Sequence, residues 1–352
     1  MRRDAREAAL DADSLDLGAL LRKQPLTLEQ ICARTGLRER DALRAIRAAQ
    51  RAGVSITLID RHYALALKDA PPAFVAGDLP VLKSDRNGVY RFGACGDNHL
   101  GSKYARLDVL NELYDIYAKE GIKTVYNTGN WIDGEASFNV HDLLVRGMEE
   151  QLDYLAEHYP RREGIVTHAV AGDDHEGWYA QKFGVDIGLR AEQTMRAAGR
   201  SDWRNLGYME AHIRLRHART GAESILAVVH PGGGSAYALS YTVQKIVESL
   251  EGGEKPAVGL YGHYHKLMVA NIRNVWTIQT GTTQDQTPFM RKKRLAAHVG
   301  GCIVELRQDA DTGAIVRCKV EMLRWFNRGF YNDRWSHARM PHPAGRALGI
   351  DD

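Results

Sequence analysis

Five short segments of the chain carry histidine, acidic and amide side chains in arrangements that suit metal ligation. They are Asp97-Asn98-His99, Gly129-Asn130-Trp131-Ile132-Asp133, Asp174-His175-Glu176, His230 and Gly262-His263-Tyr264-His265. Imidazole and carboxylate groups are ligands of transition metals, and a pair of such metals suits the hydrolysis of phosphate esters. One pair of residues departs from the simplest scheme, because Asn130 offers an amide where a carboxylate is the better bridge and Asp174 offers a carboxylate.

Each of these segments follows an apolar run that is typical of a β-strand. We predict strands at 89–95, 123–128, 165–171, 224–229 and 257–261, with helices at 107–118, 142–157 and 241–250. After His265 the pattern predicts consecutive strands at 267–272, 275–280, 302–306 and 314–322. Alternating elements followed by consecutive strands predict a layered α/β domain with mixed sheets. In such sheets ligand-bearing loops gather at the carboxyl ends of the strands, where the five segments fall.

The composition is that of an ordinary globular protein. The chain has 352 residues, 44% of them hydrophobic and 26% charged, so we expect two domains with extensions. Its four cysteines show no CxxC spacing, which favours a reducing, cytoplasmic setting over a zinc ribbon or a disulfide framework. No apolar run is long enough for a membrane span, and the N-terminus lacks an apolar signal core. The net charge of +3 neither demands nor excludes nucleic acid.

The first 68 residues predict a small separate domain. Three short helices within 14–51 and two β-like runs, 56–59 and 63–67, resemble the winged helix-turn-helix family. Thr27 and Gln30 form a capping-box signature at the second helix. Five arginines crowd the third helix, the one that such a fold lays in the DNA major groove: Arg38, Arg40, Arg44, Arg47 and Arg51. We expect DNA contact there, with protein docking or dimerisation as the alternative.

The rest of the chain divides by composition. Residues 69–87 contain Pro71, Pro72, Gly77 and Pro80, with Gly88 just beyond, and this composition predicts a linker. Residues 88–325 form the predicted α/β domain, and 326–352 a C-terminal tail. The tail mixes aromatic residues with arginines, which suits base stacking or, in the simpler interpretation, packing against the domain. The basic run Arg291-Lys292-Lys293-Arg294 suits either a phosphate backbone or a solvated loop.

Taken in order, the five segments resemble the calcineurin-like metallophosphoesterase superfamily over roughly residues 89 to 325. The resemblance implies a four-layer α/β/β/α sandwich with two divalent metal ions at the sheet edge. It implies that Asp97, His99 and His265 hold one metal and that Asp174, His230 and His263 hold the other. Asn130 would take the bridging position, His175 would serve the leaving-group oxygen as acid or charge stabiliser, and Asp133 would orient a histidine. Mn²⁺ is the metal we expect, with Fe, Zn, Ni and Mg as alternatives.

The sequence also departs from that family. There the second motif reads Gly-Asp and the third Gly-Asn-His, whereas here they read Gly129-Asn130 and Gly172-Asp173-Asp174-His175. Three interpretations stay open. The site keeps its charge through Asp174 and binds two metals, or it binds one metal tightly and one weakly, or it is degenerate and inactive. The other metal-facing positions are good ligands, which favours a working site.

The substrate is less well determined by the sequence. The start Asp97-Asn98-His99-Leu100-Gly101 resembles the double-strand-break repair nuclease branch of the superfamily. Together with the winged-helix pattern, this favours a metal-dependent phosphodiesterase that acts on DNA through a metal-activated hydroxide. One alternative is a small-molecule or nucleotide phosphoesterase with a docking domain. Another is a DNA-binding regulator with a non-catalytic phosphoesterase fold. A homodimer stays open, and the sequence identifies no partner protein.

Overall fold

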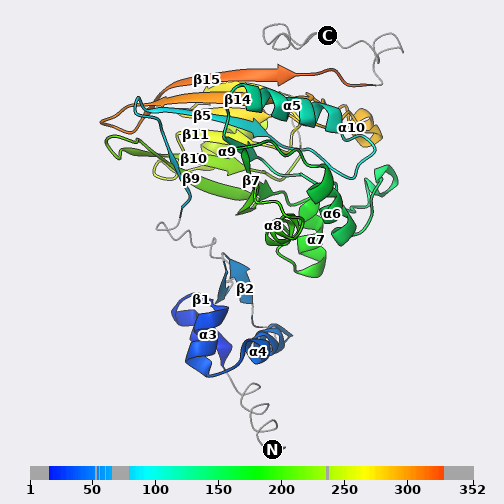
Figure 1. Ribbon diagram of the computed structural model, residues 1–352, viewed down its shortest axis with the longest axis vertical. Coiled ribbons are helices and arrows are strands. Elements are labelled where there is room, and N and C mark those ends of the chain that lie inside the picture. The colour runs from blue at the N-terminus through cyan, green and yellow to red at the C-terminus, as the bar shows by residue number, and fades with distance from the viewer. Residues whose placement is uncertain are drawn as a thin grey trace, which may run out of the picture. The chain divides into compact units, whose positions relative to one another are not determined.

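The chain forms two compact units, Met1–Asp78 and Leu79–Asp352 (Figure 1). A computed structural model describes residues 16–51, 54, 56–59, 61–65, 79–234 and 238–328. Most of the predicted tail, including Phe330, Tyr331 and Trp335, lies outside the described residues. Among the described residues, no helix combines the length and apolarity that crossing a membrane requires.

The first unit contains the three helices and the hairpin that its sequence pattern predicts. The helices are α2 (Leu17–Lys23), α3 (Leu28–Thr35) and α4 (Glu39–Arg51), and the strands β1 (Leu26–Thr27), β2 (Ile56–Ile59) and β3 (His62–Leu65) pair in the order β1-β3-β2. The capping box is confirmed, because the Thr27 hydroxyl oxygen accepts from the backbone N–H of Gln30. In return the side-chain oxygen of Gln30 accepts from the backbone N–H of Thr27. The resemblance to winged helices stays a prediction.

The surfaces of α4 separate by polarity. Ala42, Ala45 and Ile46 are buried in a small core that α2, α3 and the sheet complete. Four of the five predicted DNA-contacting arginines are exposed: Arg38, Arg40, Arg44 and Arg47. The side chain of Arg51 lies outside the described residues. The helix therefore presents a basic surface, and its contact with DNA stays a prediction.

The second unit is built on two six-stranded mixed sheets. The first sheet has the order β15-β14-β5-β6-β7-β8 and the second the order β12-β13-β11-β10-β9-β4. The first sheet consists of β5 (Val89–Cys95), β6 (Thr124–Asn127), β7 (Val166–Ala171), β8 (Trp203–Tyr208), β14 (Gly300–Gln308) and β15 (Ile315–Arg324). The second consists of β4 (Val81–Lys83), β9 (Glu210–Arg216), β10 (Glu223–Val229), β11 (Val258–Tyr261), β12 (Leu267–Ile272) and β13 (Val275–Thr280).

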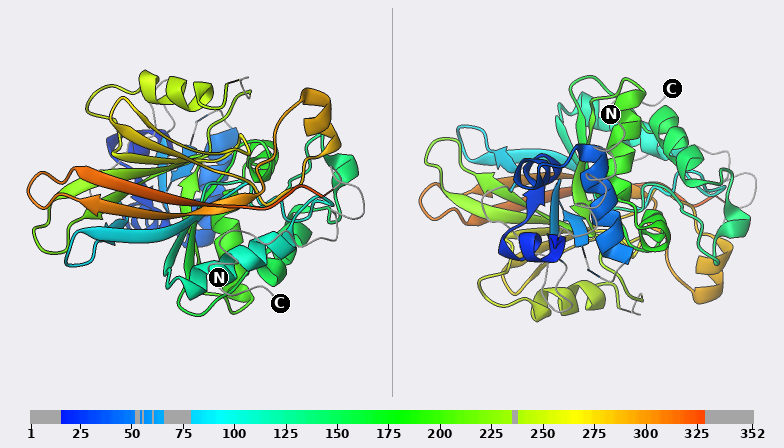
Figure 2. Two further views of the ribbon diagram at one scale, coloured as in Figure 1. Left: turned by 90° about the horizontal axis from the view of Figure 1, so that it is seen from above. Right: turned by 90° about the horizontal axis from the view of Figure 1, so that it is seen from below.

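The two sheets pack face to face, and helices cover both outer faces (Figure 2). Phe92 and Val170 from the first sheet meet Leu226 and Leu260 from the second in one buried core. The outer face of the first sheet packs against the helices α5 (Leu107–Lys119), α6 (Met148–His158), α7 (Glu176–Phe183) and α8 (Ile187–Ala197). On the other side α9 (Tyr241–Ser249) packs against β10 and β11. The predicted four-layer α/β/β/α architecture is thus confirmed.

Some predicted boundaries differ from the structure. The helix expected at 142–157 begins only at Met148, because Gly147 adopts a left-handed φ of 90° and a short 3₁₀ turn, Val140–Asp142, precedes it. Strand β4 lies within the predicted linker and pairs in parallel with β9, so the second unit reaches into that segment. The strands β8 and β9 and the helices α7, α8 and α10 (Pro288–Lys293) were not predicted.

The strand ends explain where the five polar segments lie. Strands β5, β6 and β7 are parallel neighbours, with Cys95 beside Asn127 and Asn127 beside Ala169. In the second sheet β10 and β11 are parallel, with Val229 beside Tyr261. All five strands therefore end at one edge of the sandwich, and each polar segment follows one of those ends.

Candidate metal centre

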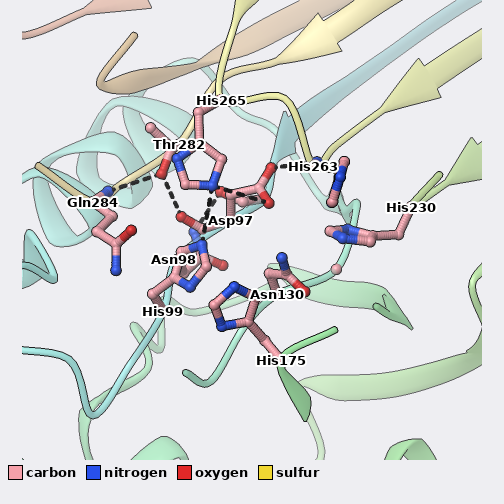
Figure 3. A network of polar contacts seen from close by, with 12 residues as sticks. Asp97, Asn98, His99, Asn130, His175, His230, His263, His265, Thr282 and Gln284 are labelled. Carbon is pink, nitrogen blue, oxygen red and sulfur yellow. Dashed lines mark hydrogen bonds and ion pairs between the residues drawn. The ribbon is translucent and has the colours of Figure 1, made fainter. Parts of the chain in front are cut away.

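The five segments meet at that edge, where two separate sets of candidate ligand atoms form and a third group, His99, Asp133 and His175, shares His99 with the first set (Figure 3). The first ligand set consists of Asp97, His99 and His265, and the second ligand set of Asp174, His230 and His263. Within each set the candidate ligand atoms lie within 4.8 Å of one another. Each set contains two imidazoles and one carboxylate, a combination that suits divalent transition metals. The structure thus brings together the residues that the sequence predicts as ligands.

The backbone is strained where it turns these side chains inward. Five residues of the site have a positive φ although they are not glycine: Asp97, His99, Asn130, His263 and His265, with φ between 48° and 71°. Such a conformation costs roughly 1–3 kcal/mol per residue and persists only where the surroundings enforce it. Hydrogen bonds between neighbouring loops do so here, from Asp97 N–H to the Gly129 carbonyl and from His99 N–H to the Asn130 carbonyl.

In the first ligand set, hydrogen bonds fix which atoms face the centre. His99 donates from Nδ1 to the Asp133 carboxylate at 2.9 Å, so its Nε2 carries a lone pair. That Nε2 lies 3.1 Å from Nε2 of His265. Asp97 accepts the His263 N–H at Oδ2, 2.8 Å away, while its buried Oδ1 has no hydrogen-bond partner among the described residues.

The second ligand set is oriented by backbone carbonyls. His230 donates from Nδ1 to the Thr128 carbonyl at 2.7 Å, and His263 donates from Nε2 to the Gly233 carbonyl at 2.6 Å. The opposite ring nitrogens, Nε2 of His230 and Nδ1 of His263, lie 3.6 Å and 3.5 Å from the Asp174 carboxylate oxygens. Both nitrogens are buried without a hydrogen-bond partner in the described part of the chain.

These unpartnered atoms show that the residues fit a metal. A buried acceptor without a partner costs roughly 1–3 kcal/mol, and ligation by a cation would remove that cost. The orphaned atoms of Asp97, His230 and His263 are the ones that face the centre. The site is also electrostatically suited to a cation. Burial disfavours charge on His230, yet Asp174 and Asp97 outweigh it and raise the pKa of its imidazole to about 9.

The exchanged residues Asn130 and Asp174 contact one another. Asn130 Nδ2 donates to Asp174 Oδ1 at 3.2 Å, and the Asn130 Oδ1 is buried without a partner among the described residues. A Cβ on Gly172 would lie only 2.2 Å from that oxygen, so a side chain at Gly172 would displace the amide. The amide of Asn130, in the second segment, thus holds the carboxylate of Asp174, in the third segment.

Asp133 links a ligand to the predicted acid. His175 donates from Nδ1 to the Asp133 backbone carbonyl at 2.7 Å and lies 3.3 Å from its carboxylate, which also binds His99. Burial disfavours the charged imidazole, but the Asp174 and Asp133 charges outweigh it and raise the pKa of His175 to about 10. Burial likewise opposes ionisation of Asp133, and its two histidine partners nonetheless lower its pKa. The two carboxylates thus favour the protonated form of His175.

Some supporting residues were not selected from the sequence. Glu176 is fully buried, and its Oε1 accepts the N–H groups of Asn130 at 2.8 Å and Gly172 at 2.6 Å. Thr282 donates its hydroxyl to the Asp97 carbonyl at 2.6 Å (Figure 3). Glu176 could have been found, since it belongs to the Asp174-His175-Glu176 segment. Thr282 carries no such signal, because it follows β13 in a segment without other site residues.

The chain is similar to several solved structures. No protein-family model matches the chain, and no curated protein matches it. One similar solved structure is a novel archaeal phosphodiesterase, with 12% identity over 66% of this chain and 100% of that chain and a TM-score of 0.33. A second is a predicted phosphoesterase from Streptococcus pneumoniae, with 12% identity over 66% of this chain and 98% of that chain and a TM-score of 0.31. A third is a putative 5'-nucleotidase from Staphylococcus aureus, with 10% identity over 71% of this chain and 57% of that chain and a TM-score of 0.37. With identities and TM-scores this low, no activity follows from them, and the class of protein is defined by its own features: a four-layer α/β/β/α sandwich with two ligand sets at one sheet edge.

Proposed function

We propose that this protein is a metal-dependent phosphodiesterase. The observation that carries the proposal is the pair of ligand sets, which contain buried ligand atoms without partners and border one cavity that also contains His175. Two divalent cations, when bound there, would neutralise the charge of a phosphate diester and make hydroxide available at neutral pH. Asp97, His99 and His265 would hold one cation, and Asp174, His230 and His263 the other.

The protein's own groups would complete the hydrolysis. A P–O bond forms to the attacking hydroxide while the P–O bond to the leaving group breaks. His175 donates its proton to the departing oxygen, so that the leaving group departs as a neutral alcohol. The Asp174 and Asp133 charges favour the protonated form of His175, and the Asp133 backbone carbonyl holds its ring through the bond at Nδ1, which leaves Nε2 for the substrate. In the described part of the site this chemistry needs no serine or cysteine nucleophile.

DNA is the substrate class that we propose for this activity. Its support is the exposed basic surface formed by Arg40, Arg44 and Arg47 on α4 and by Arg38, which directly precedes that helix. Arginine side chains on one helix suit contacts with phosphates and guanine edges. The first unit would then position the nucleic acid, while the second unit would cleave it.

The activity is tested with the purified full-length chain. Protein stripped with a chelator should hydrolyse neither bis-p-nitrophenyl phosphate nor single- and double-stranded DNA, and Mn²⁺ should restore both activities together with bound metal. His263→Ala should lose metal and activity. His158→Ala is the matched control, because that histidine is 36% exposed and lies outside the site. A chain that takes up no metal would overturn the proposal.

The substrate class is tested separately. Arg40→Ala and Arg44→Ala should each weaken DNA binding several-fold and reduce the salt dependence of affinity by about one ion per lost phosphate contact. Arg34→Ala, an exposed arginine on α3, is the matched control. Cleavage of the small diester without DNA cleavage would indicate a small-molecule phosphoesterase. Tight DNA binding without any cleavage would indicate a regulator.

A further inference from the structure

The cavity beside the metal centre has one apolar wall. It measures about 280 Å³, and its lining includes the apolar residues Phe138, Phe289, Met290 and Leu295 besides residues of the metal centre. Phe138 follows β6 in the chain, whereas Phe289 and Met290 belong to α10 and Leu295 follows that helix. Two segments far apart in the sequence thus build one surface, which we call the aromatic wall.

The two phenylalanine rings of the wall are partly exposed. Phe138 is 43% and Phe289 38% accessible, and their ring centroids lie 5.3 Å apart at an interplanar angle of 35°. Exposed apolar surface next to polar groups is a common mark of a binding site. A ligand that covered both rings would remove this surface from water.

The aromatic wall begins beside the proton donor. The Phe138 ring lies edge-on to His175, with centroids 5.4 Å apart and an interplanar angle of 85°. Because Nδ1 of His175 is bonded to Asp133, a leaving-group oxygen would be served by Nε2 of the same ring. The group attached to that oxygen would then lie along Phe138 and Phe289.

The charged residues around the cavity limit which part of a leaving group can bind there. Among the described residues that border it, none is lysine or arginine, whereas Asp133, Asp142 and Asp174 are acidic. A phosphate placed in this cavity would meet carboxylates instead of cations, so any further phosphates of a leaving DNA strand would lie outside it. An uncharged planar ring would instead stack on the phenylalanines, which contributes to binding whatever the identity of the ring.

We infer that the aromatic wall binds the leaving group of the substrate through an uncharged planar ring, a nucleobase or an aryl group. The inference rests on the proposed phosphodiesterase function and specifies which side of the diester is selected. Phe138 and Phe289 would determine specificity without taking part in proton transfer.

Three diesters separate selection by the wall from chemistry at phosphorus. Methyl 4-nitrophenyl phosphate and the dinucleotide TpT release a group with a planar ring, whereas bis(2,2,2-trifluoroethyl) phosphate releases a small alcohol. Phe138→Ala and Phe289→Ala should lower kcat/KM about tenfold for the first two substrates and less than twofold for the third. Comparing each variant with the wild type on the same substrate cancels the intrinsic reactivity. Phe289→Tyr should retain the wild-type preference.

The control is Phe183→Ala, an exposed phenylalanine on α7 that does not border the cavity. Equal losses on all three diesters would show that the rings only support the site and would overturn the inference, while the phosphodiesterase proposal would stand. If the wild type cleaves no diester, the proposed function fails, and saturation-transfer NMR with free thymidine and 4-nitrophenol then decides the inference. Binding that Phe138→Ala and Phe289→Ala abolish supports it, and absence of binding to the wild type overturns it.

Discussion

The two ligand sets have the same composition but different surroundings. In the first set the side chains of Asp97 and His99 are 0% and 1% exposed, and His265 is 10% exposed. In the second set Asp174 is 35% and His263 15% exposed, although His230 is fully buried. The first set is therefore more deeply buried than the second, although both border the same cavity.

The contacts that hold the ligands in place also differ between the two sets. The first set is held by side chains, with Asp133 on His99 and Thr282 on the backbone of Asp97. The second set is held by backbone carbonyls and by the neutral amide of Asn130. A carboxylate behind a ligating histidine raises its basicity and fixes its orientation. We therefore expect the first set to bind metal more tightly and the second to exchange it more readily.

The largest effect should come from removing the carboxylate of either set. Asp97→Ala should abolish tight metal binding and lower turnover of bis-p-nitrophenyl phosphate by about 10³-fold or more, since the more strongly held cation is lost. Asp174→Ala should keep one tightly bound metal per chain. Metal content after dialysis, measured by mass spectrometry, checks the difference. If both variants retain the same metal content, the two sets do not differ as we describe.

The next effect concerns the exchanged pair. Asp174→Asn should weaken the second metal by about 100-fold, because a neutral amide is a poorer ligand than a carboxylate. Asn130→Asp should destabilise the metal-free protein by roughly 1–3 kcal/mol, because it replaces the hydrogen bond to Asp174 by the repulsion of two neighbouring carboxylates. Thermal unfolding with chelator and with Mn²⁺ measures both effects.

The double variant Asn130→Asp with Asp174→Asn sharpens this test. It has the same charge as the natural chain but returns the carboxylate to the bridging position. Metal binding restored from the level of Asp174→Asn would show that total charge governs the site. Metal binding that stays as weak as in Asp174→Asn would show that the natural chain needs the carboxylate at position 174.

Much of the metal centre could be predicted from the sequence, because spacing and strand ends constrain it strongly. The closely spaced Asp97 and His99, and likewise His263 and His265, each follow a strand, and parallel strands end at one edge. The contact between Asn130 and Asp174 could not be predicted, because it depends on how two separate loops turn. The positive φ of Asn130 and the bare Cα of Gly172 decide that contact.

The fold was predictable where strands are uniformly apolar and less so elsewhere. Strand β9 alternates buried Ala211, Ile213 and Leu215 with histidine and arginines, and the charged residues obscured its period of two. Strand β4 has only three residues, and pairing with β9 alone defines it. The aromatic wall escaped prediction because Phe138 and Phe289 meet only through tertiary structure.

Smaller effects should distinguish the role of Asp133 from that of His175. Asp133→Asn should weaken the first metal by about 10- to 100-fold, because His99 loses its carboxylate partner, and should leave the second metal unchanged. His175→Gln should leave both metals bound and lower kcat by about 100-fold. That loss should grow for diesters with poorer leaving groups, which need the proton most. Rates across a series of substituted phenyl esters, with metal content measured in parallel, check both outcomes.

The smallest effect on metal binding should come from Glu176, which supports the second set through the backbone. Glu176→Gln keeps an oxygen for the N–H groups of Asn130 and Gly172, so metal affinity should change no more than a few-fold. Glu176→Ala leaves both buried N–H groups unpaired, which should lower the free energy of unfolding by roughly 2–4 kcal/mol and weaken only the second metal. Glu192→Ala is the matched control, because Glu192 also accepts a backbone N–H, that of Asn205, at a helix away from the centre. Urea unfolding should show a loss of stability for both alanine variants. Metal titration should show a loss of affinity for Glu176→Ala alone. An equal loss of affinity at both metals in that variant would show that the two sets share their support.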